Sequence, residues 1–300
     1  MIEEEDFLNE TFLDLGLANK QPVKWIVKNL ITDGLTIIGG PPKSGKSTLT
    51  AAIAGMVAGL KPQTLPEDLR EVPRLGKVFW FSYEANEGEL QAMMIDGLGI
   101  RVPPDGRIMV AREPWHVQID NDETVGHVLA LFDRYKPLLV IMDPLANMHS
   151  LDENVSGDMV RILAPFQVWA KKAGASVVIV HHTSKGQEDN MYFKGRHLRG
   201  SGAILGMADG ILMYSPRANN GTHIEATFKR ATAWERDMIL ATYGNRRALT
   251  RLTKQDKTIA RAYKRGITIG SIARQLNVTI EFVKERVKII KAVRHAKRLR

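Results

Sequence analysis

A glycine-rich segment at residues 40–47 has the residue types and spacing that could hold phosphate groups. It reads Gly-Pro-Pro-Lys-Ser-Gly-Lys-Ser and matches G-x-x-x-x-G-K-[ST] at every fixed position. An apolar run at 35–38 precedes it and a helical stretch at 46–58 follows it, which a chance glycine-rich turn would lack. The segment therefore predicts a site for a nucleoside triphosphate, by default ATP. The residues expected to line it are Gly40, Pro41, Pro42, Lys43, Ser44, Gly45, Lys46, Ser47 and Thr48.

Two further positions complete a predicted Mg²⁺-nucleotide site. Lys46 would neutralise the β- and γ-phosphates, and the Ser47 hydroxyl would bind Mg²⁺. The apolar run at 138–143 ends in Asp143, which would lie at the carboxyl edge of a sheet and hold the same ion. Glu84 follows another apolar run at 77–82 and could orient or deprotonate water. Spacing alone fits a solvated loop glutamate at that position better.

The elements that must position these residues form a repeated strand–helix pattern. Apolar runs throughout suit strands buried on both faces, so the fold class is α/β, a mostly parallel sheet flanked by helices. The runs are 35–38, 77–82, 107–110, 138–143, 176–180 and 210–214, with helical stretches at 46–58, 87–98, 122–135 and 157–173. Runs at 224–228 and 238–243 predict an antiparallel extension. The predicted organisation is an acidic arm (1–20), an ATPase core (21–245), a linker (246–257) and a small helical domain with a basic tail (258–300).

Composition excludes several classes of protein. The 300 residues contain no cysteine, which rules out disulfides and thiolate metal sites. No apolar run is long enough to cross a membrane, and the acidic start is unlike a secretory signal. We therefore expect a cytoplasmic protein with no membrane partner.

Positive charge is concentrated at the carboxyl end. The segment 254–300 has fourteen Lys and Arg against three acidic residues, a net +11 within a chain total of +9, so the remainder carries −2. Such asymmetry favours a polyanionic partner, nucleic acid first. The alternative is a solvated basic helix.

Together these motifs resemble the RecA-like ATPase core, and within it the RepA-like hexameric helicases of plasmids and phages. The likeness covers about residues 22–245. It rests on the segments Val23–Trp25, 39–47, Glu84, Leu151–Asn154, His181–Lys185, Arg199–Ala203 and Ala208–Asp209. In that family the position of Glu84 is the catalytic base, and the likeness favours His181 or His182 as a sensor of the γ-phosphate. It also implies a homo-oligomer, with a hexamer expected. As sequence alone, the His pair fits packed side chains better.

The resemblance also implies that the loop 184–200 faces a central channel and binds single-stranded DNA. Cations interleaved with aromatic residues suit a strand backbone and its stacked bases. The candidates are Lys185, Tyr192, Lys194, Arg196 and Arg199. A basic surface loop without that role is the alternative.

Helicases of this group place a cation from one subunit at the site of its neighbour. Lys229 and Arg230 follow the run 224–228 and are the candidates here, with Arg217 and Arg236 left open. The match departs from the family pattern, which commonly puts a residue between two cations, so the choice between Lys229 and Arg230 is open.

Residues 256–290 divide into three helical pieces and resemble the helix-turn-helix of resolvases and sigma factors. Thr279 would cap the last helix, whose outward residues would include Lys284 and Lys288 and would contact duplex DNA. A helical hairpin for subunit contact is the alternative.

The leading functional hypothesis is a DNA-stimulated ring ATPase acting as a DNA helicase in plasmid- or phage-type replication. Two alternatives remain: a RecA-type recombination or strand-annealing ATPase, and an ATP-switched DNA-binding regulator or helicase loader.

Overall fold

The structure is a computed structural model in which most of the chain is described. The described residues are 22–42, 44–62, 65, 67–183, 198, 200, 202–217, 221–243, 246–250, 254–280, 282–284, 286–287 and 290–291, without the side chains of 216–217, 221, 236–243, 246–250 and 254–255. None of the helices in this part of the chain is long and apolar enough to cross a membrane.

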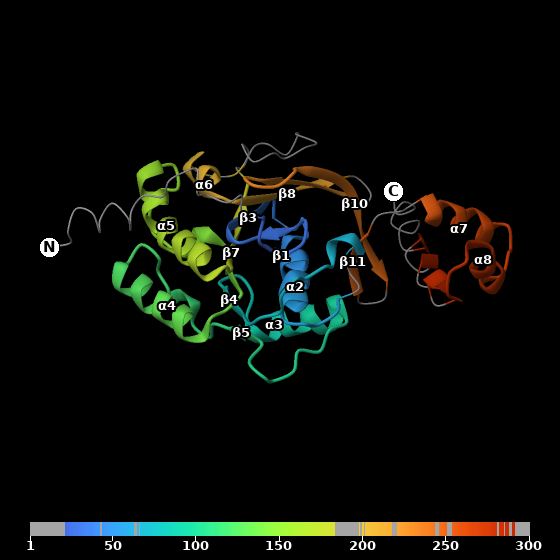
Figure 1. Cartoon of the computed structure of the whole chain (residues 1–300), viewed down its shortest axis with the longest axis horizontal. Helices are drawn as coiled ribbons and strands as arrows, with labels where there is room; N and C mark the ends of the chain where they lie inside the picture. The colour runs from blue at the N-terminus through green and yellow to red at the C-terminus, as the bar shows by residue number, and fades with distance from the viewer. Residues whose placement is uncertain are drawn as a thin grey trace.

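A nine-stranded sheet forms the centre of the molecule, in the order β11-β10-β9-β8-β3-β7-β6-β4-β5 (Figure 1). The parallel strands are β3 (Gly34–Gly40), β4 (Val78–Ser82), β5 (Ile108–Val110), β6 (Leu139–Asp143), β7 (Ser176–His182) and β8 (Gly210–Arg217). The antiparallel extension is β9 (Gly221–Phe228), β10 (Trp234–Tyr243) and β11 (Arg246–Thr250). Each predicted strand is present, and so is the predicted α/β class.

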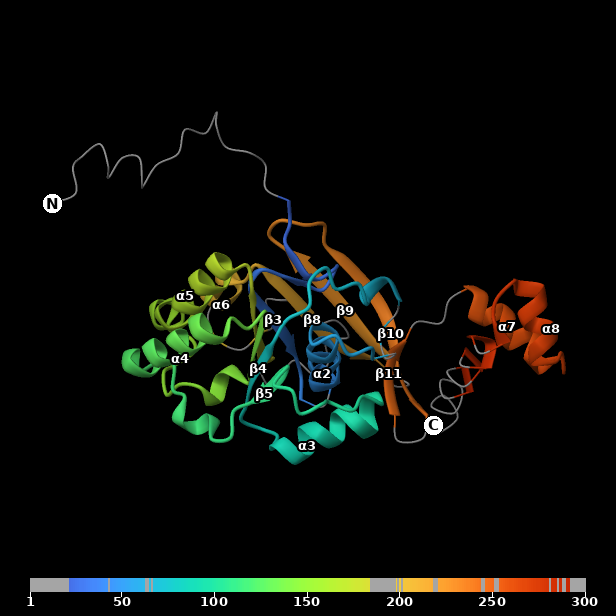
Figure 2. The same cartoon turned by 60° about the horizontal axis from the view of Figure 1, so that its bottom comes forward.

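Helices cover both faces of the parallel strands (Figure 2). One core cluster packs α2 (Lys46–Val57) and α3 (Glu87–Ala92) with its π-helical continuation Met93–Gly97 onto one face. The other cluster packs α4 (Asp122–Tyr135), α5 (Ser156–Ala173) and α6 (Gly202–Met207) onto the opposite face. Alternate residues of β3, β4, β6, β7 and β8 enter alternate clusters, which explains why the sequences of these strands are mostly apolar. A short hairpin of β1 (Trp25–Val27) and β2 (Ile31–Thr32) precedes β3, and single 3₁₀ turns lie at Glu67–Leu69, Pro114–His116 and Leu145–Asn147.

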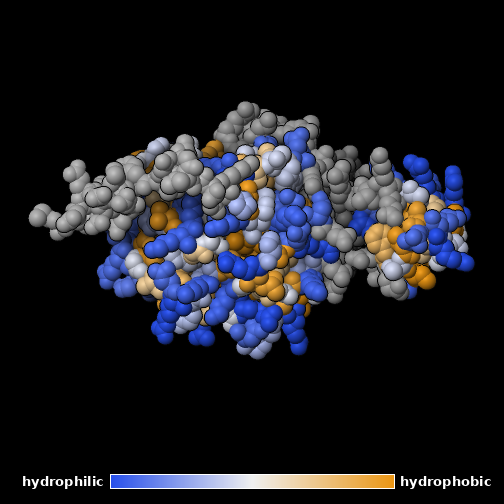
Figure 3. Space-filling view, in the orientation of Figure 1, coloured by the Kyte–Doolittle hydropathy of each residue, from blue (hydrophilic) through white to orange (hydrophobic). Residues whose placement is uncertain are grey.

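The carboxyl-terminal helices form a separate small unit beside β10 and β11 (Figure 1). Helices α7 (Lys254–Lys264) and α8 (Ile269–Leu276) share a core with the described residues after Ile280, which are helical as far as Lys291. The Thr279 hydroxyl accepts a hydrogen bond from the Phe282 amide at 3.1 Å, so the predicted helix cap is present. Buried Asp256 forms an ion pair with Arg286 and joins the two ends of this unit. On the face seen in Figure 3, its outer end is hydrophilic.

The prediction of a linker over 246–257 is wrong at both ends. Residues 246–250 form β11, which pairs with β10 from Tyr243↔Arg246 to Ile239↔Thr250, and α7 already begins at Lys254. The sequence Arg-Arg-Ala-Leu-Thr has little apolar signal because an edge strand needs main-chain pairing more than side-chain burial. The division of the chain into an arm, an ATPase core and a small helical domain stays a prediction.

Asp209 joins three elements at the amino-terminal edge of the parallel strands. Its buried carboxylate accepts the Leu35 amide at 3.0 Å and the Gln167 side-chain amide at 3.1 Å, and lies 3.0 Å from Lys171. Gly34, with φ of 95°, leaves room for it, because an added Cβ would lie 2.3 Å from the carboxylate. Asp209 therefore ties β3 and α5 to the segment that enters β8.

We expect Asp209→Ala to lower the free energy of unfolding by about 2–4 kcal/mol, because it leaves a buried amide without an acceptor. Urea unfolding followed by circular dichroism measures this change. Replacement of exposed Asp96 by Ala is the matched control and should change stability by less than about 0.5 kcal/mol. Equal effects of the two substitutions would contradict the role of Asp209.

Candidate nucleotide-binding site

Two glycines shape the turn between β3 and α2. Gly40 has φ of 152° and Gly45 has φ of 100°, values that side chains with a Cβ rarely adopt. At Gly40 an added Cβ would also lie 2.8 Å from the Cβ and carbonyl oxygen of Tyr214. The fold itself therefore requires glycine at the first motif position.

The amide groups at the amino terminus of α2 are not capped by a side chain and could bind an anion. Gly45 is the N-cap, so no side chain caps the helix, and the first turn contains no acidic residue. The buried Ser44 hydroxyl has no hydrogen-bond partner among the described residues. Free amides, the helix dipole and this hydroxyl fit a phosphate group. Lys43 lies outside the described residues. Pro42 is exposed, Pro41 and Ser47 are half-buried, and Thr48 is buried in the first turn of α2.

The Lys46 side chain folds back over the turn. Its Nζ donates to the carbonyl oxygens of Gly40 at 2.9 Å and Pro41 at 2.8 Å. Burial lowers the pKa of Lys46 to about 8, against the opposing charges of Asp143 and Glu84. A polyanion at this turn would favour the ammonium form, because an opposite charge raises the pKa of a lysine.

Asp143 ends β6 next to this lysine and is 6% exposed. Burial and, to a smaller extent, the Glu84 charge raise the pKa of Asp143 to about 7, while the Lys46 charge opposes both. A buried carboxylate in this condition gains from a divalent cation, and Asp143 with Ser47 offers the oxygen ligands that Mg²⁺ prefers. The residues present therefore fit the predicted Mg²⁺ site.

Glu84 stands on a turn that local hydrogen bonds hold in place. The Ser82 hydroxyl, at the end of β4, donates to the Ala85 carbonyl at 2.7 Å and accepts the Ala85 amide at 3.2 Å. Asn86 then caps α3 in a reciprocal capping box with Glu89. The half-exposed Glu84 carboxylate is thereby set at the carboxyl edge of the sheet, facing the end of β7.

His182 lies between Glu84 and Lys46. Its Nε2 is 3.3 Å from Glu84 Oε1, and its Nδ1 is 3.5 Å from Lys46 Nζ. A lysine ammonium only donates, so Nδ1 must accept and Nε2 must carry the proton that the carboxylate accepts. One neutral tautomer of His182 therefore satisfies both contacts and links the phosphate-binding lysine to the candidate base.

The structure does not bring His181 to this group. In β7 it pairs with Gly39 and His182 pairs with Gly40, so the two imidazoles lie on opposite faces of the sheet. Buried His181 instead lies 3.9 Å from Glu153, on the side of α5. Of the two histidines predicted as a sensor, only His182 can contact the nucleotide side.

Lys229 and Arg230 lie at the opposite, amino-terminal edge, because Phe228 pairs with Gly210 at the start of β8. The Lys229 amine donates to the carbonyls of Gly206 at 2.8 Å and Met207 at 3.3 Å, at the end of α6. Arg230 forms an ion pair with Asp33, whose side chain is buried. Neither cation reaches the site of its own chain. The side chains of Arg217 and Arg236 lie outside the described part.

The predicted DNA-binding residues are mostly outside the described residues. They are Lys185, Tyr192, Lys194, Arg196, Arg199 and Lys288. Lys284 is described and exposed on the small helical unit. Their roles stay predictions.

Sequence reasoning missed the groups that hold Glu84. The spacing Asn-Glu-Gly-Glu at 86–89 is a capping-box pattern and could have revealed the start of α3. Nothing in the sequence marks Ser82 as the residue that shapes the turn, because its hydroxyl acts through two local contacts with Ala85.

Comparison with known proteins agrees with this architecture. A family model described as an AAA domain matches residues 3–188. The solved structure titled "ATPase Domain of G40P" is similar with a TM-score of 0.55 and 13% identity, over 73% of this chain and 85% of that chain. A DnaB-like replicative helicase, solved with its interactions with primase, has a TM-score of 0.52 and 13% identity, over 72% of this chain and 57% of that chain. At this identity the likeness concerns the fold, and it confirms the predicted RecA-like arrangement.

The raised pKa of Asp143 predicts that the free energy of unfolding depends on pH when no nucleotide is bound. A carboxyl whose pKa is higher in the folded state binds its proton more tightly there, so stability falls as pH rises from about 4 to about 7. Asp143→Asn cannot ionise, so at pH 8 it should stabilise the nucleotide-free protein by roughly 2–4 kcal/mol relative to the parent.

At pH 4.5 most of this gain should be absent, because the parent carboxyl is then protonated in the folded state. Urea unfolding at both pH values measures the difference, with exposed Asp96→Asn as the control. A gain that does not change with pH would contradict the cause given for the shift.

Proposed function

This chain belongs to the AAA domain family, and from that premise we propose that it is a magnesium-dependent, DNA-stimulated ATPase that acts as a DNA helicase. The active form would be a ring of identical subunits, as the resemblance to hexameric helicases implies. The titles of the two similar structures name an ATPase domain and a replicative helicase, which supports the same class for this chain.

The observation that carries the proposal is the meeting of four strand ends. Neighbouring parallel strands β3, β7, β6 and β4 deliver the phosphate-binding turn, His182, Asp143 and Glu84 to one edge. The contacts of His182 with both Lys46 and Glu84 make these groups one connected unit. A structural role alone would not require an exposed base, a buried acid and a lysine at the same place.

Each residue has a definite task in hydrolysis. Lys46 balances the charge of the phosphates, and Glu84 orients a water molecule and accepts its proton. When Mg²⁺ is bound it supplies further charge balance at the phosphates, held by Ser47 and Asp143. If Lys46 moves from His182 to a phosphate, the contact at His182 Nδ1 is lost. The imidazole ring is then free to shift, and this changes its hydrogen bond from Nε2 to the Glu84 carboxylate. His182 would in this way report the presence of the γ-phosphate.

The cation that acts from a neighbouring subunit is proposed to be Lys229 or Arg230. Strand β3 has seven residues and spans about 20 Å, so residues at its two edges cannot share one site in a single chain. Either cation must therefore act on a second copy and must give up its present partner to do so.

Removal of the base tests the ATPase proposal. Glu84→Gln should lower turnover by about 10²–10⁴-fold while leaving ATP affinity within a few-fold, because only proton transfer is lost. Glu87→Gln, exposed three residues further on, is the matched control and should keep full turnover. The readouts are ATP hydrolysis and strand separation on a forked duplex, each with and without single-stranded DNA. If the parent protein hydrolyses ATP but does not separate strands, the ATPase proposal stands and the helicase proposal fails. The strand-annealing or regulator alternative is then favoured. Full turnover in Glu84→Gln would remove Glu84 from the mechanism.

The small helical unit is proposed to bind duplex DNA as a helix-turn-helix. Deletion of residues 251–300 should weaken DNA binding and reduce the slope of log K against log [salt], because about 0.9 counterion is released per phosphate contact. Fluorescence anisotropy from 50 to 300 mM NaCl measures this slope. Lys46→Ala, which keeps the tail, should retain the parent slope, and an unchanged slope in the deletion would contradict DNA binding by the tail.

A further inference from the structure

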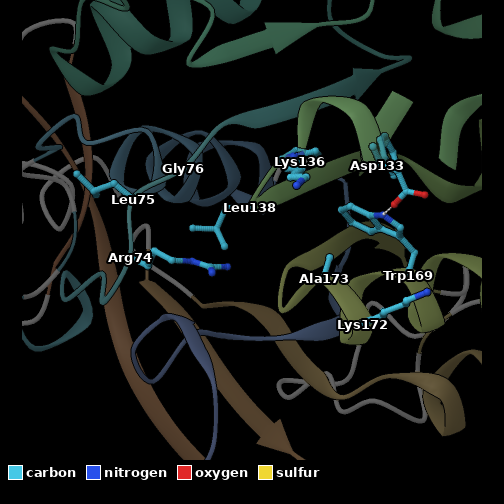
Figure 4. A pocket seen from close by; sticks show the side chains of 11 residues that line it. Arg74, Leu75, Gly76, Asp133, Lys136, Leu138, Trp169, Lys172 and Ala173 are labelled. Atoms are coloured by element: carbon cyan, nitrogen blue, oxygen red, sulfur yellow. Dashed lines mark hydrogen bonds between the residues drawn. The ribbon is translucent and has the colours of Figure 1, made fainter. Parts of the chain in front are cut away.

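Two adjoining cavities open at the amino-terminal edge of the parallel strands, at the end of the sheet opposite the candidate nucleotide site. Their volumes are about 620 and 470 Å³. They share Arg74, Lys172 and Ala173 and therefore lie side by side; together we name them the edge groove. It lies between the ends of α4 and α5 and the segment before β4 (Figure 4).

Apolar and charged residues together line the larger cavity. Leu75, Leu138 and Trp169 are among the apolar residues that line it, and Leu75 is 62% exposed. Arg74, Lys136 and Lys172 are exposed around it. An apolar lining under several cations suits a partner that combines apolar and acidic side chains.

The positive charges of Arg74, Lys136 and Lys172 are not paired with carboxylates of the described residues. Among the described residues, none of these three cations has a carboxylate within 4 Å, and Arg74 donates to the Gly174 carbonyl at 2.8 Å. Asp133 is the acidic residue of the lining, and its carboxylate already accepts the Trp169 indole N–H at 2.9 Å. In the smaller cavity Lys24 adds another positive charge.

The amino-terminal arm has the complementary composition. Residues 1–20 contain six acidic residues against Lys20, a net −5. Aromatic and aliphatic residues recur within the same stretch as the pairs Phe7–Leu8 and Phe12–Leu13, followed by Leu15 and Leu17. The family match begins at residue 3, so the arm is part of the matched domain.

Chain connectivity brings the arm to the groove. Val23 and Lys24, at the start of the described chain, line the smaller cavity. The fifteen residue-to-residue steps from Phe7 to Pro22 can span up to about 50 Å when extended, so the arm can reach the larger cavity with length to spare. A tethered segment also has an effective concentration of about millimolar at a site beside its attachment point.

We propose that residues 3–17 of the arm dock in the edge groove of their own chain. The phenylalanine and leucine side chains cover the apolar lining, and the acidic residues face Arg74, Lys136 and Lys172. The proposal rests on the groove and the arm alone and does not depend on the ATPase or helicase assignment.

The absence of cysteine in the chain permits a direct test by disulfide trapping. Asn9→Cys is combined with Leu75→Cys in the full-length protein, and in a second double variant with Lys136→Cys, since both groove positions are exposed. Mild oxidation should give a cross-link within one chain, seen on a non-reducing gel and by intact mass. The yield should exceed by roughly fivefold that of the control pair Asn9→Cys with Glu113→Cys, which lies beyond the carboxyl end of β5.

Charge reversal distinguishes docking from chance collision. Arg74→Glu with Lys172→Glu should lower the yield to that of the Glu113 control, whereas Lys257→Glu with Lys264→Glu on α7 should leave it unchanged. Cross-links between two chains would overturn the assignment to the own arm and indicate a second copy as occupant. A yield at the control level for both groove positions would overturn docking altogether.

Discussion

Parallel pairing of four neighbouring strands is the constraint on which the candidate site depends. The registers of β3 with β7, β7 with β6 and β6 with β4 place the carboxyl ends of these strands at one edge. Residues that are up to 142 positions apart, from Gly40 to His182, become neighbours because of this register alone. A shift of one residue in β7 would turn His182 to the α5 face and put His181 in its place.

At the same edge, the charged forms of Lys46 and Asp143 are only partly stabilised by other charges of the protein. Burial moves the pKa of Lys46 down to about 8 and that of Asp143 up to about 7, so each is displaced towards its neutral form. The attraction between them opposes both displacements without cancelling either. A triphosphate and a divalent cation would favour the charged forms of both groups. Part of the binding free energy of the nucleotide would therefore come from relief of a cost that is already present in the folded protein.

Much of this site could be predicted from local sequence, and the rest depends on long-range geometry. The turn at 40–47 and Asp143 follow from short patterns whose chemistry is local to one strand end. The choice between His181 and His182 depends on which face of β7 packs against α2, and the sequence of β7 is apolar on both faces. Strand β11 was missed because its pairing with β10 is made by the main chain, and polar side chains on an edge strand conceal it. The edge groove was also invisible, since its lining comes from separate segments of the chain.

Different features lie at the two edges of the sheet. The carboxyl edge holds the candidate nucleotide-binding residues, whereas the amino-terminal edge holds Lys229, Arg230 and the edge groove. Asp33 connects the last two features, since it pairs with Arg230 and its amide donates to the Lys24 carbonyl beside the groove at 2.9 Å. A neighbouring subunit that draws Arg230 towards its own phosphates would therefore leave the buried Asp33 carboxylate without its cation, next to Lys24 of the edge groove. Loss of a partner for a buried charge is costly, so the segment at 23–33 would have to adjust. If a neighbouring subunit binds Arg230 and the arm docks in the edge groove, both as proposed, the two events should for this reason be energetically coupled, even though neither requires the other.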